Sequence, residues 1–344
     1  MRYIIDISPQ LAEQLGGIVS SGKYRTVQDF VKVAVENQLY LESKGSQELG
    51  LVSELSTPKD SEMKRSSRDS TSDVLRLPHA LSQIKTIAVS GVERPKYLWG
   101  QYNRFLPVKV VTRVAANLLA ERDSETVPLA ELQEVAAEAA RQFGKVVERS
   151  DRLAGRKRGT ILSAGLPVGK EEEKAKARFK TQFVGSIVKN RMEGASPALK
   201  FIEMKRDSSR SAWAGITDFG LKFASLSNPV LDNNRSESPF SHEEVGYLLD
   251  HIWKEVPQEA NLMQYILERV KEGIATPEEL NQKLHYDRLR DWKHNEVITM
   301  RAGLVSRLSE LGLLTRQKFG VNVKYLLTDI GEKYRTASVA QQAT

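Results

Sequence analysis

The first 42 residues constrain the fold most, because they form a periodic unit too short to enclose a core. Residues 2–8, RYIIDIS, alternate as a strand with Tyr3, Ile5 and Ile7 on one side. Ser8-Pro9 is typical of a helix start, and apolar residues recur at helical spacing in 9–19 and again in 27–39. One strand and two helices of this length cannot bury a core alone. A second copy would supply the missing half, so residues 1–42 predict a homodimer.

The segments RYIIDISPQLAEQL and SGKYRTVQDFVKVAVENQL together resemble the ribbon-helix-helix family of Arc-, MetJ- and CopG-type repressors. In that family the paired strands enter the major groove, and the N-terminus of the second helix binds a backbone phosphate. The resemblance implies base contacts from Arg2, Ile4 and Asp6. It implies a phosphate contact from Arg25 and Thr26. The family usually carries basic or amide side chains where this chain has Ile4 and Asp6, so a dimerisation unit without DNA contact is the alternative.

The rest of the chain predicts two further folded regions separated by polar breaks. Residues 43–77 are rich in Ser, Lys, Glu and Asp and predict a flexible linker. Residues 78–230 and 241–335 each read as helices followed by a basic hairpin, with a second linker at 231–240 and a tail at 336–344. The predicted fold class is therefore mainly α with small β hairpins.

Charge is distributed unevenly among these regions. The formal net charge is +7 overall, with −1 in residues 1–78, +10 in 79–230 and −2 in 231–344. A basic middle between nearly neutral flanks favours a module that contacts a polyanion such as double-stranded DNA.

The middle region predicts helices at 107–121, 129–150 and 171–190, then strands at 199–205 and 212–217. This order resembles a winged helix, and WAGITDFGLKFA resembles its last wing strand and the turn after it. The resemblance implies that the third helix enters the major groove while the wing touches an adjacent groove or the backbone. The implied contacts are Lys174, Arg178 and Lys180 on the helix, Lys205, Arg206 and Arg210 on the wing, and a basic cluster of Arg156, Lys157 and Arg158.

The C-terminal region begins with predicted capping boxes at Ser241 and Thr276. A helix is predicted at 297–311 and a hairpin around 318–320. The stretch SRLSELGLLTRQKFGVNVKYLLTDIGEKY resembles the end of many bacterial and archaeal winged-helix regulators. That resemblance places Arg301, Ser306 and Arg307 on or near a recognition helix and Arg316, Lys318 and Lys324 in the wing. The regional charge of −2 leaves a protein partner or a second copy as the alternative to DNA.

Several function classes are disfavoured. The chain has no cysteine, which excludes disulfides, thiolate metal sites and cysteine nucleophiles. Its five histidines show no metal-ligand spacing, so no metal or cofactor is expected. The stretch GLPVGK at 165–170 is one residue short of a phosphate loop, and Glu171 follows it where a phosphate loop requires Ser or Thr. Nucleotide binding at this stretch is therefore not expected. No apolar run is long enough for a membrane span.

These patterns predict a non-catalytic, cytoplasmic, nucleoid-associated protein of prokaryotic type that binds double-stranded DNA. The leading hypothesis is a dimeric transcriptional regulator, such as a repressor of its own operon. One alternative is a DNA partition or organising adaptor. Another is a DNA-holding subunit of a nucleic-acid-processing or defence complex.

Overall fold

The computed structural model describes residues 26–27, 74–78, 81–157, 159–233 and 238–342. The chain divides into two compact units, Met1–Glu62 and Met63–Thr344. In the first unit only Thr26 and Val27 are described, and both are exposed. The predicted base contacts Arg2, Ile4 and Asp6, the predicted phosphate contact Arg25 and most of the predicted linker 43–77 lie outside the described residues.

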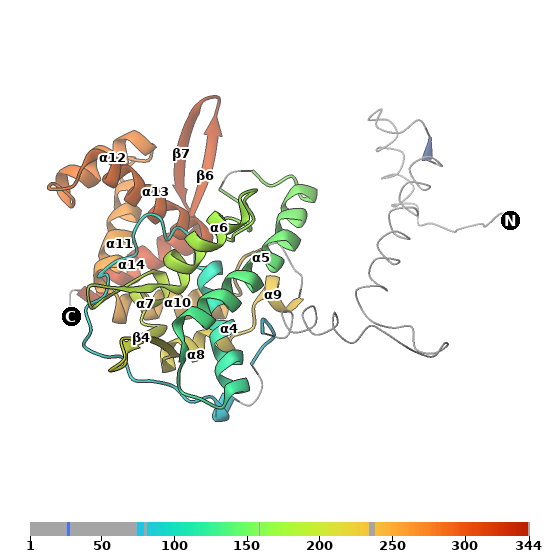
Figure 1. The fold of residues 1–344 in the computed structure, drawn as a ribbon. Coiled ribbons are helices and arrows are strands. Elements are labelled where there is room, and N and C mark those ends of the chain that lie inside the picture. Colours follow the sequence, from blue (N-terminus) through green and yellow to red (C-terminus); the bar gives the residue numbers. More distant parts are fainter. Residues whose placement is uncertain (1–25, 28–73, 79–80, 158, 234–237, 343–344) are drawn as a thin grey trace. The chain divides into compact units, whose positions relative to one another are not determined.

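The described part of the larger unit is mainly helical with small antiparallel sheets (Figure 1). Its helices are α4 (Leu106–Arg122), α5 (Leu129–Leu153), α6 (Glu172–Phe179), α7 (Ala195–Ala198), α8 (Asp218–Ser225), α9 (Pro229–Asn233), α10 (His242–Glu255), α11 (Pro257–Lys271), α12 (Pro277–Asp287), α13 (His294–Glu310) and α14 (Asp329–Gln342). A 3-10 turn, η1 (Leu81–Gln83), precedes them, and a π-helical turn, η2 (Lys180–Val184), continues α6. The strands are β1 (Val127–Pro128), β2 (Ser186–Val188), β3 (Arg191–Glu193), β4 (Ile202–Arg206), β5 (Ala212–Ile216), β6 (Leu314–Phe319) and β7 (Asn322–Leu327).

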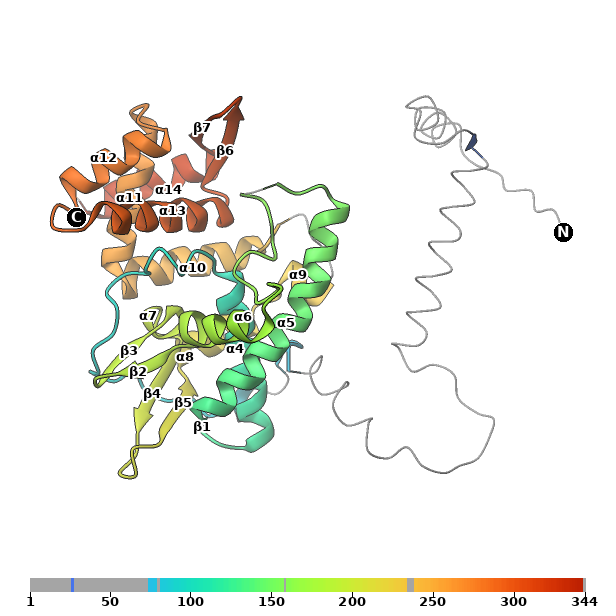
Figure 2. The same cartoon turned by 45° about the horizontal axis from the view of Figure 1, so that its top comes forward.

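The strands form three small sheets. The first has the order β1-β5-β4, and β2-β3 and β6-β7 are two-stranded. Ala214 of β5 lies opposite both Val127 of β1 and Met204 of β4, so β5 is the central strand. Figures 1 and 2 place the β4–β5 hairpin and the β6–β7 hairpin at opposite ends of the larger unit.

Most predicted elements occur close to their predicted bounds, but the third helix of the middle region does not. It was expected over 171–190, whereas α6 and η2 end at Val184 and β2 follows. The β-branched Ile187 and Val188 favour an extended backbone, and they pair with Met192 and Arg191 of β3. The strand predicted from Leu199 likewise begins later, at Ile202, because Leu199 follows directly on α7.

The capping boxes predicted at Ser241 and Thr276 are confirmed. Ser241 accepts a hydrogen bond from the backbone N–H of Glu244, and the Glu244 side chain accepts one from the backbone N–H of Ser241. Thr276 and Glu279 form the same reciprocal pair at the start of α12. Each box satisfies backbone N–H groups that the first helical turn leaves free.

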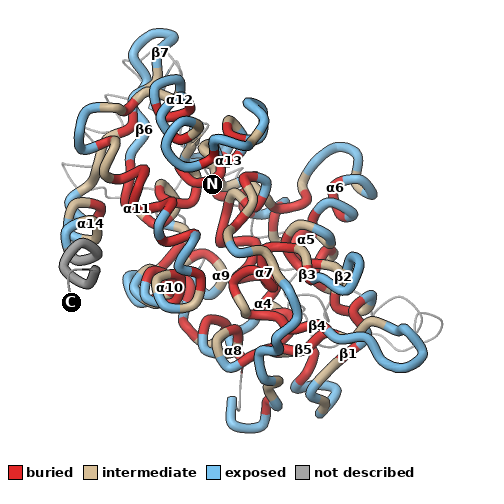
Figure 3. Tube along the Cα trace, turned by 90° about the vertical axis from the view of Figure 1, so that its left-hand side faces the viewer, coloured by how far each residue is buried: buried red, intermediate tan, exposed pale blue. Residues whose placement is uncertain are grey.

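One hydrophobic cluster runs through both predicted folded regions. It includes Leu132 and Phe201 from the middle region and Leu248 and Leu304 from the C-terminal region. Figure 3 shows α4 buried along most of its length. The segment 231–240 was predicted as a linker, but α9 extends into it and Phe240 is only 3% exposed. The two regions therefore pack around a shared core in this part of the chain.

Buried charges also connect the two regions. The Lys109 ammonium on α4 lies 2.8 Å from a Glu244 carboxylate oxygen on α10, and both side chains are 0% exposed. Lys109 also donates to the carbonyl oxygen of Leu226 at 2.7 Å. Burial lowers the pKa of Lys109 to about 8, against the opposing effect of Glu244. Removing either partner would leave an uncompensated charge in the core.

Candidate nucleic-acid interface

A groove of about 680 Å³ runs along α13 between the β6–β7 hairpin and two loops of the middle region. We call it the α13 groove. Its polar lining includes the guanidinium groups of Arg104, Arg301 and Arg316 and the hydroxyl groups of Thr299 and Ser306. Among the described residues that line it, none is Asp or Glu. A concave site with several guanidinium groups and no carboxylate suits an anionic ligand.

The middle region contributes one wall of this groove through a very close backbone approach. A Cβ placed on Gly100 would lie 2.0 Å from the carbonyl oxygen of Thr299, and one on Gly303 would lie 2.5 Å from the Cα of Gly100. Only glycine fits such an approach. The loop around Gly100 therefore rests directly on α13, while Ile298 and Ala302 of the same helix line the groove.

Arg307, predicted as a DNA contact on this helix, is a structural residue instead. Its side chain is 0% exposed and lies 2.7 Å from a carboxylate oxygen of Glu259, which is also fully buried. The guanidinium donates to the carbonyl oxygens of Leu98 at 3.0 Å and Tyr102 at 2.8 Å. A buried guanidinium with this many partners cannot reach DNA, so we remove Arg307 from the predicted contacts.

Glu310, at the C-terminal end of α13, fixes the helix against α4. Its carboxylate accepts hydrogen bonds from the backbone N–H of Phe105 at 2.5 Å and of Leu106 at 3.2 Å. A carboxylate at the N-terminus of α4 also complements the positive end of that helix. These hydrogen bonds fix the positions of the two groove walls relative to each other.

Two arginines of the groove lining, Arg301 on α13 and Arg104 just before α4, are anchored by other groups of the protein. Arg301 donates to the side chain of Asn281 at 3.0 Å and to the hydroxyl oxygen of Tyr325 at 3.2 Å. Arg104 donates through Nη1 to the carbonyl oxygen of Ser306 at 2.8 Å, while its buried Nε has no hydrogen-bond partner in the described structure. Both guanidinium groups are thus held beside the groove.

The strand register separates the cations of the β6–β7 hairpin into two faces. Arg316 lies opposite Tyr325 and Lys318 opposite Val323, so these four side chains share one face. Arg316, Val323 and Tyr325 line the α13 groove, which shows that this face is turned toward it. Lys324 lies on the other face and lines a separate pocket together with Asp329 and Glu332. Of the predicted wing contacts, Arg316 lines the groove, Lys318 lies on the same face of the hairpin, and Lys324 lies on the other face.

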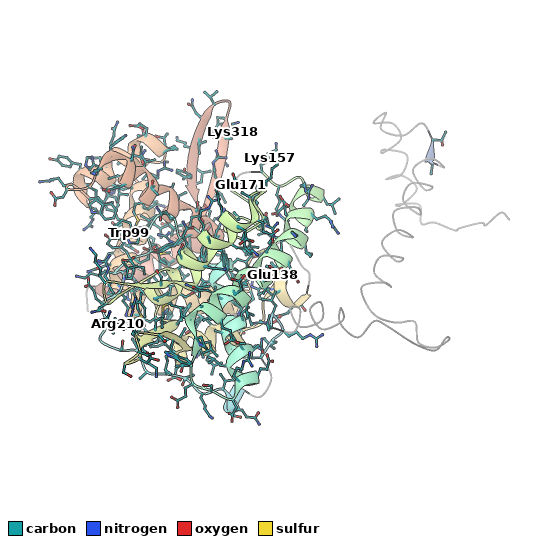
Figure 4. The ribbon with its side chains drawn as sticks, viewed as in Figure 1. Trp99, Glu138, Lys157, Glu171, Arg210 and Lys318 are labelled. Carbon is teal, nitrogen blue, oxygen red and sulfur yellow. The ribbon has the colours of Figure 1, made fainter. Side chains whose placement is uncertain are left out.

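The predicted basic cluster of the middle region lies near this hairpin. Figure 4 shows Lys157 and Lys318 at the same end of the larger unit, and a Cβ on Gly159 would lie 3.4 Å from the Cδ of Arg316. Lys157 is exposed, while Arg156 forms an ion pair with Asp151 at 3.1 Å. Arg158 lies outside the described residues. The fold therefore gathers cations from segments about 160 residues apart.

The predicted contacts on α6 and η2 are largely neutralised. Lys174 is ion-paired with Glu171, and Lys180 is ion-paired with Glu134. Arg178 has no carboxylate partner among the described residues and donates only to the carbonyl oxygen of Lys174 at 3.4 Å. The sequence places five basic residues on or beside α6 and η2. Nearby carboxylates cancel most of the positive electrostatic field that these basic side chains would produce.

The β4–β5 hairpin presents Lys205, Arg206 and Arg210 at the opposite end of the unit, where Figure 4 shows Arg210. All three side chains are exposed. The acceptor Asp207 lies among them and bonds to the indole N–H of Trp213 at 3.0 Å. The structure does not bring these residues together with the α13 groove.

The residues that sequence reasoning missed are Gln101, Asn103 and Arg104. They lie in a non-periodic loop within the stretch WGQYNRF, so no helix or strand pattern marks them. A group of polar side chains among large aromatic residues is the only local signal.

Comparisons with known protein families, curated proteins and solved structures find no match to this chain. Within the described ranges, no three His, Asp or Glu side chains converge to hold a metal ion. No helix in those ranges is long and apolar enough to cross a membrane.

Proposed function

We propose that the protein is a non-catalytic DNA-binding protein of the cytoplasm, most simply a dimeric transcriptional regulator, whose main duplex contact is the α13 groove. The observation that carries this proposal is the carboxylate-free lining with three guanidinium groups beside a helix and an exposed basic hairpin. Neutralisation of backbone phosphates supplies much of the affinity of such proteins.

The order of elements supports winged-helix modules in both regions. In the C-terminal region α11, α12 and α13 precede the β6–β7 hairpin, and the backbone N–H of Tyr325 donates to the carbonyl oxygen of Ala275, between α11 and α12, at 2.9 Å. In the middle region α4, β1, α5 and α6 precede β4 and β5, and the sheet order is β1-β5-β4. A winged helix has the succession of helix, short strand, two helices and hairpin. The middle region has this succession with η2, β2, β3 and α7 inserted before the hairpin, and the described C-terminal region has it without the short strand. In that arrangement α13 would face the major groove and β6–β7 would be its wing.

Duplex binding is tested with the full-length protein and labelled duplexes of varied sequence, measured by fluorescence anisotropy between about 50 and 200 mM salt. We expect affinity to fall steeply with salt, because counterions are released when phosphates are neutralised. An absence of binding at the lowest salt would contradict the proposal. Footprinting then separates the roles: one palindrome indicates a regulator, iterated sites indicate a partition adaptor, and no preference indicates a complex subunit.

Dimerisation is proposed for residues 1–42 on the sequence resemblance alone. We expect the full chain to sediment as a dimer and a chain lacking residues 1–42 to sediment as a monomer. A truncated chain that remains a tight dimer would place the interface in the larger unit instead. The mixed-charge pocket lined by Lys324 and Glu332 is where a protein partner of the C-terminal region would fit.

A further inference from the structure

A second, smaller pocket adjoins the α13 groove. It has a volume of about 240 Å³, and Gln101 and Asn103 line both spaces. Arg178 and Gln182 line its other side. Among the described residues around this pocket, again none is Asp or Glu. The described linings of these two adjoining spaces therefore contain no carboxylate, from Arg316 on β6 to Arg178 on α6.

Three side-chain amides line this space without a side-chain hydrogen bond to any residue in the described part of the chain. Gln101 is exposed, and Asn103 and Gln182 are partly exposed. None of these amides makes a side-chain hydrogen bond to another described residue. We call the space the amide pocket. Each amide offers a donor and an acceptor side by side, which is the pairing that reads the edge of a nucleobase.

Part of the inner surface of the amide pocket is apolar. Phe179 and Phe183 line it and are each 2% exposed, and Leu166 and Pro167 complete the wall. Gly165 also lines it with a φ of +87°, and a Cβ there would lie 2.9 Å from Pro107 and 3.3 Å from the ring of Phe183. A side chain at this position would thus be strained and crowded, so glycine keeps the wall open.

The size and charge of the pocket restrict its occupant. Its volume is below the roughly 300–1,000 Å³ of pockets for drug-sized ligands, so it suits one small planar group. Arg178, which lacks a carboxylate partner among the described residues, lies beside it and can bind a phosphate. Apolar side chains in part of the wall, amide edges and an adjacent cation together match a single nucleotide.

We propose that the amide pocket receives one unstacked nucleobase of the nucleic acid bound in the α13 groove. This inference rests on the proposed DNA-binding function and specifies its ligand as a nucleic acid with one unstacked base. The base can come from within a duplex, by rotation out of the stack, or from a single-stranded end beside a duplex. Unstacking costs free energy, least for a base that is already unpaired. The protein should therefore prefer DNA in which one base is already free.

The test measures the affinity of the full-length protein for three labelled DNAs of equal length. One is fully paired, one has a single-nucleotide bulge at the centre, and one has a short single-stranded overhang. We expect about tenfold tighter binding of at least one unpaired DNA, because the cost of unstacking is removed. A preference for the bulge indicates an internal base, and a preference for the overhang indicates an end.

The decisive variant is Gln182→Leu, which removes an amide that lines the amide pocket but not the α13 groove and keeps the side chain similar in size. We expect the preference for unpaired DNA to disappear while the affinity for paired DNA changes by less than about threefold. The matched control is Gln258→Leu, an exposed amide on α11 that lines neither space. If Gln182→Leu does not fold, as judged by thermal unfolding, Gln182→Met tests the same contact.

Equal affinity of the wild-type protein for all three DNAs would overturn the inference and leave the proposed function intact. A preference that survives in the Gln182→Leu variant would also overturn it. Failure of the wild-type protein to bind any of the DNAs would instead overturn the proposed function itself.

Discussion

The two long hairpins of the larger unit carry three cations each, but their surroundings differ. On β6–β7, Arg316 and Lys318 face a groove whose described lining has no carboxylate. On β4–β5, Arg206 donates to the carbonyl oxygen of Ile187 at 3.2 Å, and Asp207 sits in the turn. The first hairpin borders a concave surface shared by two regions of the chain, and none of the grooves described above includes the second.

The comparison shows that the position of carboxylates locates a polyanion site better than the number of cations does. The middle region carries a net charge of +10 and the C-terminal region −2, yet the carboxylate-free groove is built mainly on the C-terminal region. On α6 the excess of Lys and Arg is offset by Glu171, Glu172 and Glu173. The electrostatic field at a surface depends on which charged side chains form ion pairs there. The net charge of a whole region does not show this.

The largest expected effect concerns the contact that holds the groove together. Arg307→Met should lower the free energy of unfolding by about 3–5 kcal/mol, because it leaves Glu259 buried without its partner. Urea unfolding followed by circular dichroism measures this loss. The matched control is Arg316→Met on the exposed face of β6, which should change stability by less than about 0.5 kcal/mol. Equal losses for the two variants would show that the distinction between the buried and the exposed arginine is wrong.

The next effect tests the β6–β7 hairpin directly. Replacing Arg316 and Lys318 with Gln should weaken duplex binding on the order of tenfold and reduce the salt slope by about 2, one for each lost phosphate contact. Anisotropy titrations at several salt concentrations measure both quantities. The control is Lys324→Gln on the opposite face of the hairpin, which should leave the slope nearly unchanged. A larger effect for Lys324 than for the pair would reverse the assignment of faces.

The sequence predicted the local structure of the C-terminal region well because its signals are local. Capping boxes at Ser241 and Thr276 and the alternation around Gly320 depend on residues close in sequence. The burial of Arg307 depends on its contacts with Glu259 and with the carbonyl oxygens of Leu98 and Tyr102, which lie far away in the chain. The winged-helix resemblance placed Arg307 on or near a recognition helix, and only tertiary packing shows that it faces inward.

The candidate groove could be predicted only in part for the same reason. Its hairpin and helix were expected, including Arg301 and Arg316. The wall formed by Asn103 and Arg104 was not, because a loop without periodicity gives no indication of what it packs against. Predictions for residues 1–25 remain predictions, since they lie outside the described structure.

A smaller effect is expected at the other hairpin. Changing Lys205, Arg206 and Arg210 together to Ala should weaken duplex binding by no more than about threefold and flatten the salt slope by less than about 1. These cations are exposed but lie at the end of the unit away from the α13 groove (Figure 4). The measurement is the same titration used for β6–β7, at identical salt concentrations. A loss equal to that of the Arg316 and Lys318 variant would show that both ends contact DNA, and the contrast between the hairpins would fail.

The smallest effect separates the two faces of β6–β7 by pH. Hydrogen bonds from Arg335 and Lys271 lower the pKa of Glu332, behind the hairpin, to about 2. A carboxylate with a lowered pKa stabilises the fold above the usual glutamate pKa of about 4.3, and this contribution is lost as pH falls toward 2. Glu332→Gln should therefore lower the midpoint of thermal unfolding slightly at pH 6 and by less as the pH approaches 2. DNA affinity at neutral pH should stay the same, because Glu332 does not line the α13 groove. A variant that instead gains or loses DNA affinity would link the back of the hairpin to the groove and contradict the separation of its faces.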